Sequence, residues 1–192
     1  FLVVTIPLIK QCDLLIFSDF NYGCLPQELV DQIISACKDA NVLMAADSQS
    51  SSQYGNIARY RNMKLVTPTE REARLAVGDR SAGLVNLASQ LQAISDAENV
   101  LMTLGSEGMF IQTKIENEYQ ELMSDRIGAL NPNPVDVAGA GDSMLVASAM
   151  SLATGSSIWH ASLMGSIAAA IQVARLGNVP ITAVEVKSEL RE

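Results

Sequence analysis

The segment Asp136–Asp142 has the residue types and spacing with which a protein chain can hold a phosphate group. It reads DVAGAGD and is followed by a helix-forming run that begins at Ser143. Gly139 and Gly141 permit a tight turn, and a turn that enters a helix leaves its first backbone N–H groups free to bind an anion, with the helix dipole adding positive potential. Asp142 is then expected beside the bound phosphate.

Two other interpretations of this segment stay open on the residues alone. In the first, it is an ordinary helix N-terminus, with Asp142 or Ser143 as the cap and the glycines only making room. In the second, it is the dinucleotide-binding loop of an oxidoreductase. The second is disfavoured because Met144 stands where the third glycine is needed and the segment lies late in the chain. The residues by themselves favour the helix cap.

Two further segments follow predicted strands and contain residues that could contact a ligand. The stretch 67–72 reads TPTERE and places Glu72 in the first turn of a helix, where an exposed carboxylate is favoured by the dipole whatever its function. The stretch 103–108 reads TLGSEG, and Gly105 and Gly108 predict a tight turn into a β-hairpin. Alone, neither segment indicates a function.

Together these segments resemble the PfkB, or ribokinase-like, family of carbohydrate kinases. The segment DVAGAGD is similar to the family signature Asp-Thr-x-Gly-Ala-Gly-Asp at every position except Val137, where threonine is usual. The resemblance implies that Asp142 is the general base that takes the proton from the sugar hydroxyl. It also implies that the backbone amides of Gly139, Ala140 and Gly141 form an anion hole for the transferred phosphoryl group. A carboxylate suits the first task, and phosphoryl transfer depends mostly on positioning and charge stabilisation.

The resemblance extends to the other two segments. Thr69 and Glu72 are similar to the family's Asn-x-x-Glu element, with threonine in place of asparagine, so that Glu72 would arrange a magnesium ion and its waters near the phosphates. Thr103, Gly105 and Gly108 resemble the Thr-x-Gly-x-x-Gly turn that lies against the ribose and phosphates of the nucleotide. The implied cofactors are ATP and Mg²⁺, with a monovalent cation as a further candidate.

Asp136 and Ser166 complete the nucleotide-binding residues that the resemblance implies. Asp136 is the first residue of the signature, and Ser166 stands where many family members carry an asparagine beside the adenine ring, although it could equally be a small core residue. The stretch 18–23 and Asp47 resemble strand ends of kinases that act on D-glycero-D-manno-heptose 7-phosphate. Ser48-Gln49 replaces the Pro-Lys of those relatives. The implied acceptor is therefore a small-molecule sugar or sugar phosphate.

Short β-rich runs alternate with helical patterns along most of the chain, which predicts an α/β fold with three layers and a mainly parallel sheet flanked by helices. An antiparallel strand is expected at one edge, after the Gly105–Gly108 turn. The expected strands cover 14–17, 42–46, 63–66, 100–104 and 109–112, and the expected helices begin at Pro26 or cover 69–77, 84–95, 143–153, 157–176 and 182–190.

The composition fits one domain over residues 1–192 with one sizeable core, since 48% of the 192 residues are hydrophobic. The 13 Lys and Arg against 21 Asp and Glu give a net charge of -8, which disfavours nucleic acid or an anionic membrane as a partner. The three cysteines form no Cys-x-x-Cys pair and indicate reduced thiols in a cytoplasmic protein.

The resemblance starts near Asp13 and corresponds only to the later portion of a family member. It implies that the N-terminal portion and the β lid, which supply most sugar contacts, are missing, so we expect little or no kinase turnover from this chain alone. The apolar start Phe1–Ile9 is expected to expose apolar surface and to favour self-association, with a homodimer as one candidate. The alternatives from other classes are a non-catalytic nucleotide-binding module and, with less support, a Rossmann-type oxidoreductase domain.

Overall fold

A computed structural model describes residues 2–49, 55–115 and 121–190, which contain a six-stranded sheet with its strands in chain order. The first four strands are parallel, whereas the last two are antiparallel to their neighbours. This arrangement confirms the α/β fold and the antiparallel edge. The strands are β1 (Leu14–Asp19), β2 (Leu43–Ser48), β3 (Leu65–Val66), β4 (Asn99–Thr103), β5 (Met109–Lys114) and β6 (Leu122–Ile127).

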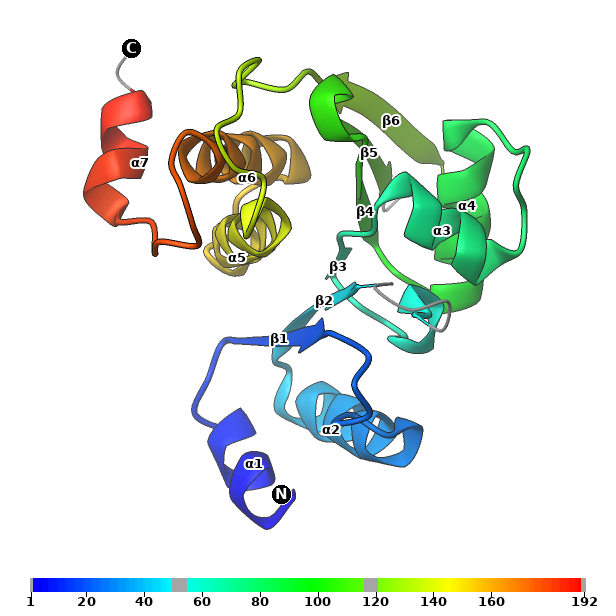
Figure 1. The fold of residues 1–192 in the computed structure, drawn as a ribbon. Helices are drawn as coiled ribbons and strands as arrows, with labels where there is room; N and C mark the ends of the chain where they lie inside the picture. Colours follow the sequence, from blue (N-terminus) through cyan, green and yellow to red (C-terminus); the bar gives the residue numbers. More distant parts are fainter. Residues whose placement is uncertain (1, 50–54, 116–120, 191–192) are drawn as a thin grey trace.

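Helices cover both faces of the sheet and make three layers (Figure 1). Helices α1 to α4 pack on one face and α5 and α6 on the other, while α7 lies outside α6. Successive strand residues point to opposite faces, so Met102 joins the first core and Leu101 the second. The helices are α1 (Leu2–Ile9), α2 (Gln27–Ala40), α3 (Glu70–Val77), α4 (Leu84–Ser95), α5 (Ala140–Ala153), α6 (Ile158–Val173) and α7 (Ala183–Glu189).

Several elements differ from the sequence-based expectation, and helix α1 was not expected at all. Helix α5 begins at Ala140 instead of Ser143, because Gly139 takes the N-cap position. Strand β3 contains only two residues. Strand β6 was not expected, because nearly all of its side chains are exposed and its sequence, LMSDRI, shows no clean alternation; its backbone pairing with β5 holds it in the sheet.

The first helix exposes apolar side chains, as expected for the start of the chain. Val3 is 88% exposed and Val4 68%, whereas Ile9 is buried in the first core. Phe1 lies outside the described residues. Self-association through this surface stays a prediction. Within the described ranges, no helix is both long and apolar enough to cross a bilayer.

Candidate active site

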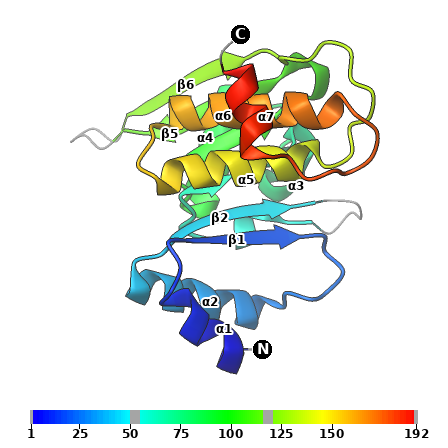
Figure 2. The same ribbon diagram turned by 90° about the vertical axis from the view of Figure 1, so that its left-hand side faces the viewer.

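The carboxyl ends of the parallel strands and the start of α5 lie on the same side of the molecule. In Figure 2 the arrows of β1 and β2 point towards the end at which α5 begins. Ligands of open α/β sheets bind outside the carboxyl ends of the strands, where loops and helix N-termini converge. The predicted site residues can therefore meet at this end.

The segment Asp136–Asp142 forms a tight turn into α5 with Gly139 as the N-cap. Gly139 has a φ of 75° and makes no side-chain cap, and the N–H of Ser143 donates to its carbonyl at 3.0 Å. Asp142 is thus the third residue of the helix, and the interpretation of Asp142 or Ser143 as the cap is wrong. A φ of 75° favours glycine, which adopts it without the strain that a Cβ would add.

Some of the first-turn amides of α5 remain available for a ligand. The N–H of Ala140 donates to the carbonyl of Val137 at 3.3 Å, so this amide is partly used by the turn itself. Within the described parts of the chain, the N–H groups of Gly141 and Asp142 donate to no protein acceptor. The first turn of a helix normally leaves such groups, and they attract anions.

Glu72 is held in place by the start of α3. The N–H of Thr69 donates to its Oε2 at 2.8 Å, while the N–H of Glu72 donates to the Thr69 hydroxyl at 3.2 Å. This reciprocal capping box leaves Glu72 only 8% exposed, so the expectation of an exposed first-turn carboxylate is wrong.

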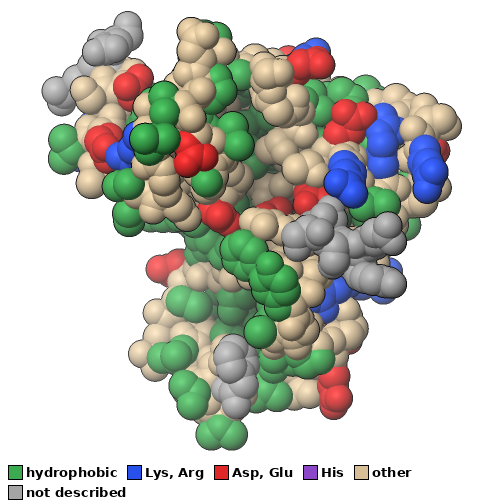
Figure 3. Space-filling model, in the orientation of Figure 1, with side chains coloured by type: hydrophobic (Ala, Val, Ile, Leu, Met, Phe, Trp, Pro, Cys, Tyr) green, Lys and Arg blue, Asp and Glu red, His purple; other side chains and the backbone are tan. Residues whose placement is uncertain are grey.

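The tertiary structure brings several of these residues around one hollow of about 250 Å³. It joins the ends of β2 and β4 and the starts of α3 and α5, so that Glu72, Thr103 and Gly141 line the same hollow. Acidic side chains gather at the centre of this face in Figure 3, between the regions of α5 and α3. The hollow is lined by Asp47, Gln49, Thr67, Thr69, Glu72, Thr103 and Gly141.

Asp47 was noted in the sequence only as a strand end similar to that of heptose-type kinases, without a role in binding or catalysis. It is the penultimate residue of β2, is 7% exposed, and lies near two other carboxylates. Burial raises the pKa of Asp47 to about 7, and the negative charges of Glu72 and Asp142 add to this rise. Its position at the carboxyl end of a parallel strand was the available signal.

Seven predicted site residues lie outside the lining of this hollow: Gly139, Ala140 and Asp142 at the start of α5, and Gly105, Gly108, Asp136 and Ser166. Gly105 and Gly108 form the turn between β4 and β5, where a Cβ on Gly108 would overlap the backbone at Ile127. Asp136 accepts hydrogen bonds from nearby backbone N–H groups, which lower its pKa. Ser166 is buried within α6, 6% exposed, as the core-packing alternative expects.

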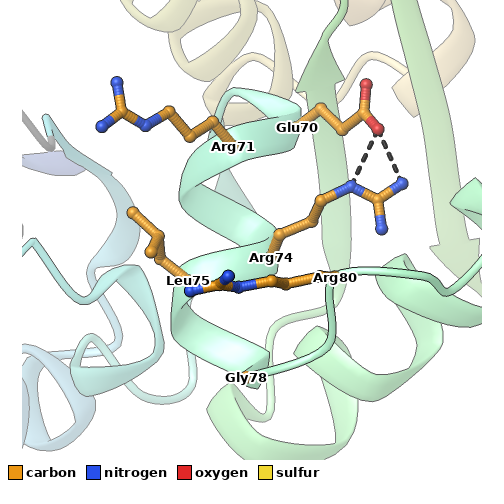
Figure 4. Close-up of a pocket in the computed structure, with 6 residues that line it drawn as sticks. All are labelled: Glu70, Arg71, Arg74, Leu75, Gly78 and Arg80. Carbon is orange, nitrogen blue, oxygen red and sulfur yellow. Dashed lines mark hydrogen bonds and ion pairs between the residues drawn. The ribbon is translucent and has the colours of Figure 1, made fainter.

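A larger and separate hollow of about 880 Å³ lies on α3. Figure 4 shows Arg71 and Arg80 extending from different sides of it, while Arg74 forms an ion pair with Glu70 at 2.6 Å. None of the predicted site residues lines it. The chemistry implied by the sequence therefore belongs to the smaller hollow.

Comparison with known proteins decides the family. Residues 3–182 match the family described as pfkB family carbohydrate kinase. The chain belongs to this family. Its curated relatives include the bifunctional protein HldE of Desulfatibacillum aliphaticivorans, 32% identical over 187 residues, and that of Shewanella piezotolerans, 33% identical over 186. Each alignment covers 96% of this chain but only 36% of the relative, so the chain spans about a third of the length of these relatives.

Solved structures share the fold. Ribokinase from Thermotoga maritima superposes with a TM-score of 0.77 at 22% identity, over 99% of this chain and 60% of ribokinase. Phosphofructokinase-2 from Escherichia coli in complex with potassium gives 0.76 at 18%, over 95% of this chain and 59% of that enzyme. The chain thus has the ribokinase-like fold, and its pfkB membership argues against the oxidoreductase alternative.

The donor atoms around the small hollow fit a magnesium ion that is bound together with a nucleotide. Asp47 and Glu72 offer carboxylate oxygens, which Mg²⁺ prefers. Across the described residues, no group of three or more His, Cys, Asp or Glu side chains is placed to hold a metal by itself. The site therefore suits an ion that takes most of its ligands from phosphate oxygens and water.

Proposed function

We propose that this chain provides the nucleotide-binding side and the general base of an ATP-dependent kinase for a sugar or sugar-phosphate hydroxyl. One observation carries the proposal: Glu72, Thr103 and Gly141 line the same hollow, and Asp142 lies close enough for its negative charge to raise the pKa of Asp47. Free helix N-terminal amides beside carboxylates suit a phosphate group with a magnesium ion. Family membership supplies the reaction class.

Each residue has a distinct task in this proposal. Asp142, which is partly exposed, accepts the proton of the acceptor hydroxyl as that oxygen attacks the phosphoryl group. Gly141 presents a backbone N–H to the phosphoryl oxygens, and Gly139 and Ala140 shape the turn that aims it. Bound ATP and Mg²⁺ supply the phosphoryl group and neutralise its charge. Glu72 and Asp47 position the metal through their carboxylates.

The nucleotide contacts beyond the hollow belong to the same proposal. Thr103, Gly105 and Gly108 place the β4–β5 turn against the ribose and phosphates, and Asp136 supports the anion-binding turn. The resemblance assigns Ser166, which is buried in α6, to the adenine side. A monovalent cation and a cytoplasmic location stay predictions. The free cysteines, of which Cys37 is buried, are compatible with a reducing compartment.

The acceptor we propose is a sugar phosphate of the heptose type. The similarity of this chain to two HldE proteins and of the stretch 18–23 to heptose-type kinases supports that choice. We also propose that the chain alone turns over little, because it spans only 36% of those relatives.

A non-catalytic nucleotide-binding module is the second candidate. Thr69, which replaces the usual asparagine, uses its hydroxyl to cap α3. Val137, which replaces the usual threonine, is 70% exposed and offers no hydroxyl to a triphosphate. Both replacements would weaken nucleotide binding but would leave the turn Asp136–Asp142 in place.

Titration of the full-length protein separates these candidates. We expect ATP with Mg²⁺ to bind more tightly than NAD in calorimetry, and ADP release to depend on added heptose 7-phosphate. ATP binding without sugar-dependent ADP release would favour the non-catalytic module. Tighter binding of NAD, or no nucleotide binding by folded protein, would contradict both.

A further inference from the structure

We propose that Gln172, near the end of α6, is a positioning residue that clamps the turn Asp136–Asp142 into the geometry needed for phosphate binding. This inference rests on the proposed function for its consequence, but its structural basis is independent of it. Gln172 is fully buried at 0% exposure, and its amide Nε2 donates to two carbonyl oxygens. One is that of Ala138 at 3.2 Å, inside the turn, and the other is that of Gly177 at 2.9 Å, in the loop after α6.

The same two loops are joined a second time by Asp136. Its Oδ1 accepts from the N–H of Ala138 at 3.0 Å, and its Oδ2 accepts from the N–H of Gly177 at 2.9 Å. Both side chains thus bridge Ala138 and Gly177. The Asp136 carboxylate accepts from their N–H groups, and the Gln172 amide donates to their carbonyl oxygens. Figure 2 shows the loop after α6 beside the loop that enters α5.

Two backbone bonds and one packing contact complete this arrangement. The carbonyl of Val173, the neighbour of Gln172, accepts from the N–H groups of Val135 at 2.7 Å and Asp136 at 3.2 Å. Asn178 packs its side chain where a Cβ on Gly139 would lie. The turn is therefore held from its first residue to its N-cap by the end of α6 and the loop behind it.

The chemistry of Gln172 suits this clamp better than a role in the core alone. Its side chain is neutral, so it can be buried, and its NH₂ group has two hydrogens for two carbonyls. Its Oε1 is buried with no hydrogen-bond partner in the described part of the chain. That unpartnered oxygen is destabilising, whereas the two bonds from Nε2 satisfy carbonyls that an apolar side chain would leave without this donor.

The clamp acts on the reaction through Gly141 and Asp142. Gly141 lies three residues beyond Ala138, whose carbonyl Gln172 holds, and the intervening Gly139 has the freedom of a positive φ. Without the clamp, Ala138 can rotate its peptide and re-aim the amides that follow it. Gln172 touches no reacting atom in this account and affects catalysis only by fixing the turn.

The test compares two buried helical glutamines in the full-length protein. Gln172→Met keeps length and volume but cannot donate. Gln92→Met is the matched control, because Gln92 is 2% exposed in α4 and donates to the carbonyl of Glu98 at 2.9 Å, on the opposite face of the sheet. Amide hydrogen exchange over 136–142 and initial-rate kinetics are measured for both, with melting temperature as a measure of global stability.

We expect Gln172→Met to accelerate exchange in the turn by about tenfold or more and to lower kcat by about 10- to 100-fold, since a displacement of about 1 Å costs that much. The KM for the sugar should change less than about twofold. Gln92→Met should lower the melting temperature without either effect. Should Gln172→Met fail to fold, Gln172→Asn serves instead, because its shorter amide can reach only one carbonyl, and smaller changes of the same kind are expected.

Unchanged exchange in the turn, or an equal loss of kcat in Gln92→Met, would overturn the clamp. If the wild-type protein phosphorylates no sugar, the proposed function fails, and the exchange data still decide whether Gln172 holds the turn.

Discussion

The two helix starts that border the hollow are built in opposite ways. In α3, Thr69 and Glu72 bind each other's N–H groups, so the first turn is closed by the chain's own side chains. In α5, Gly139 has no side chain to offer, and in the described parts of the chain the N–H groups of Gly141 and Asp142 donate to no acceptor. The closed start fixes a carboxylate at the hollow, whereas the open start leaves donors for an anion.

The largest expected effect comes from Asp142 at the open start. In the full-length protein, Asp142→Asn removes the proton acceptor and should lower turnover by about 10²- to 10⁴-fold. ATP affinity and melting temperature should change little, because Gly139 and not Asp142 caps α5. Initial rates, nucleotide titration and thermal unfolding measure all three. Turnover near that of the wild type would overturn the assignment of the base.

The second prediction concerns Asp47, which lines the hollow that both helix starts border. Burial raises the pKa of Asp47 to about 7, above the value of about 3.9 expected in the unfolded chain. The folded state therefore binds more protons than the unfolded state between about pH 4 and pH 7, and the free energy of unfolding falls as pH rises through this window. Asp47→Asn should remove that slope and stabilise the protein above about pH 7, by at most roughly 4 kcal/mol.

Urea unfolding at about pH 5 and pH 8 measures this slope, and a further measurement at about pH 3 covers the acid range in which the control variant should act. Asp19→Asn is the control with the opposite sign. Burial acts to raise the pKa of Asp19, but hydrogen bonds from Arg59 and Tyr60 hold it below its ordinary value. Asp19 therefore stabilises the folded state at neutral pH and loses that contribution in acid. An Asp47→Asn protein with the wild-type pH slope would show that Asp47 is ionised and solvated.

A third prediction concerns Gly139, the N-cap at the open start of α5. Gly139→Ala adds a Cβ at a φ of 75° that overlaps the side chain of Asn178, so unfolding free energy should fall by roughly 2 kcal/mol or more and ATP binding should weaken. Gly155→Ala is the matched control, because its φ is 87° but nothing lies within 4 Å of the added carbon. Denaturant unfolding of the two variants isolates the contact with Asn178. Equal losses of stability would show that the contact contributes nothing.

The smallest expected effect comes from breaking the capping box at the start of α3. Thr69→Ala removes the hydroxyl that caps α3 and should cost about 1 kcal/mol. It should also weaken Mg²⁺-dependent ATP binding, because the N–H of Glu72 loses its acceptor and the first turn of α3 holds the carboxylate less firmly, with the bond from the Thr69 N–H to Oε2 kept. Thr182→Ala breaks the equivalent capping box of α7, whose Thr182 and Glu185 are absent from the lining of the hollow. Similar stability losses are expected, with nucleotide binding reduced only in Thr69→Ala; reduction in both would contradict a local role.

Elements with strong local signals were predicted correctly from the sequence. The helical pattern of 84–95 matches α4, and the Gly105–Gly108 turn leads into the antiparallel strand β5. The start of α5 was misplaced because Asp142 and Ser143 are good caps by type, while the turn contacts that put Gly139 in the cap position are tertiary. Strand β6 was not predicted from the sequence, because its stability comes from backbone pairing with β5 and not from burying one face.

The site was predicted in part, for a similar reason. Glu72 and Gly141 each lie in a local segment with a recognisable pattern, and their meeting at one hollow follows from the parallel strands. Asp47 was noted only as a strand end similar to that of heptose-type kinases, and Gln172 lies in no recognisable motif. Their importance depends on burial and on partners distant in sequence, such as Glu72 for Asp47 and Ala138 for Gln172.

The sequence by itself determined the α/β alternation, the pfkB signature and the chemical groups that the reaction needs, because backbone preferences and side-chain types act over a few residues. Only the tertiary structure decided which amides stay free, that Asp47 shares the hollow with Glu72, and that α6 holds the turn before α5. These features depend on which donors and acceptors are removed from water and paired across the fold, and that pairing exists only once the layers have packed.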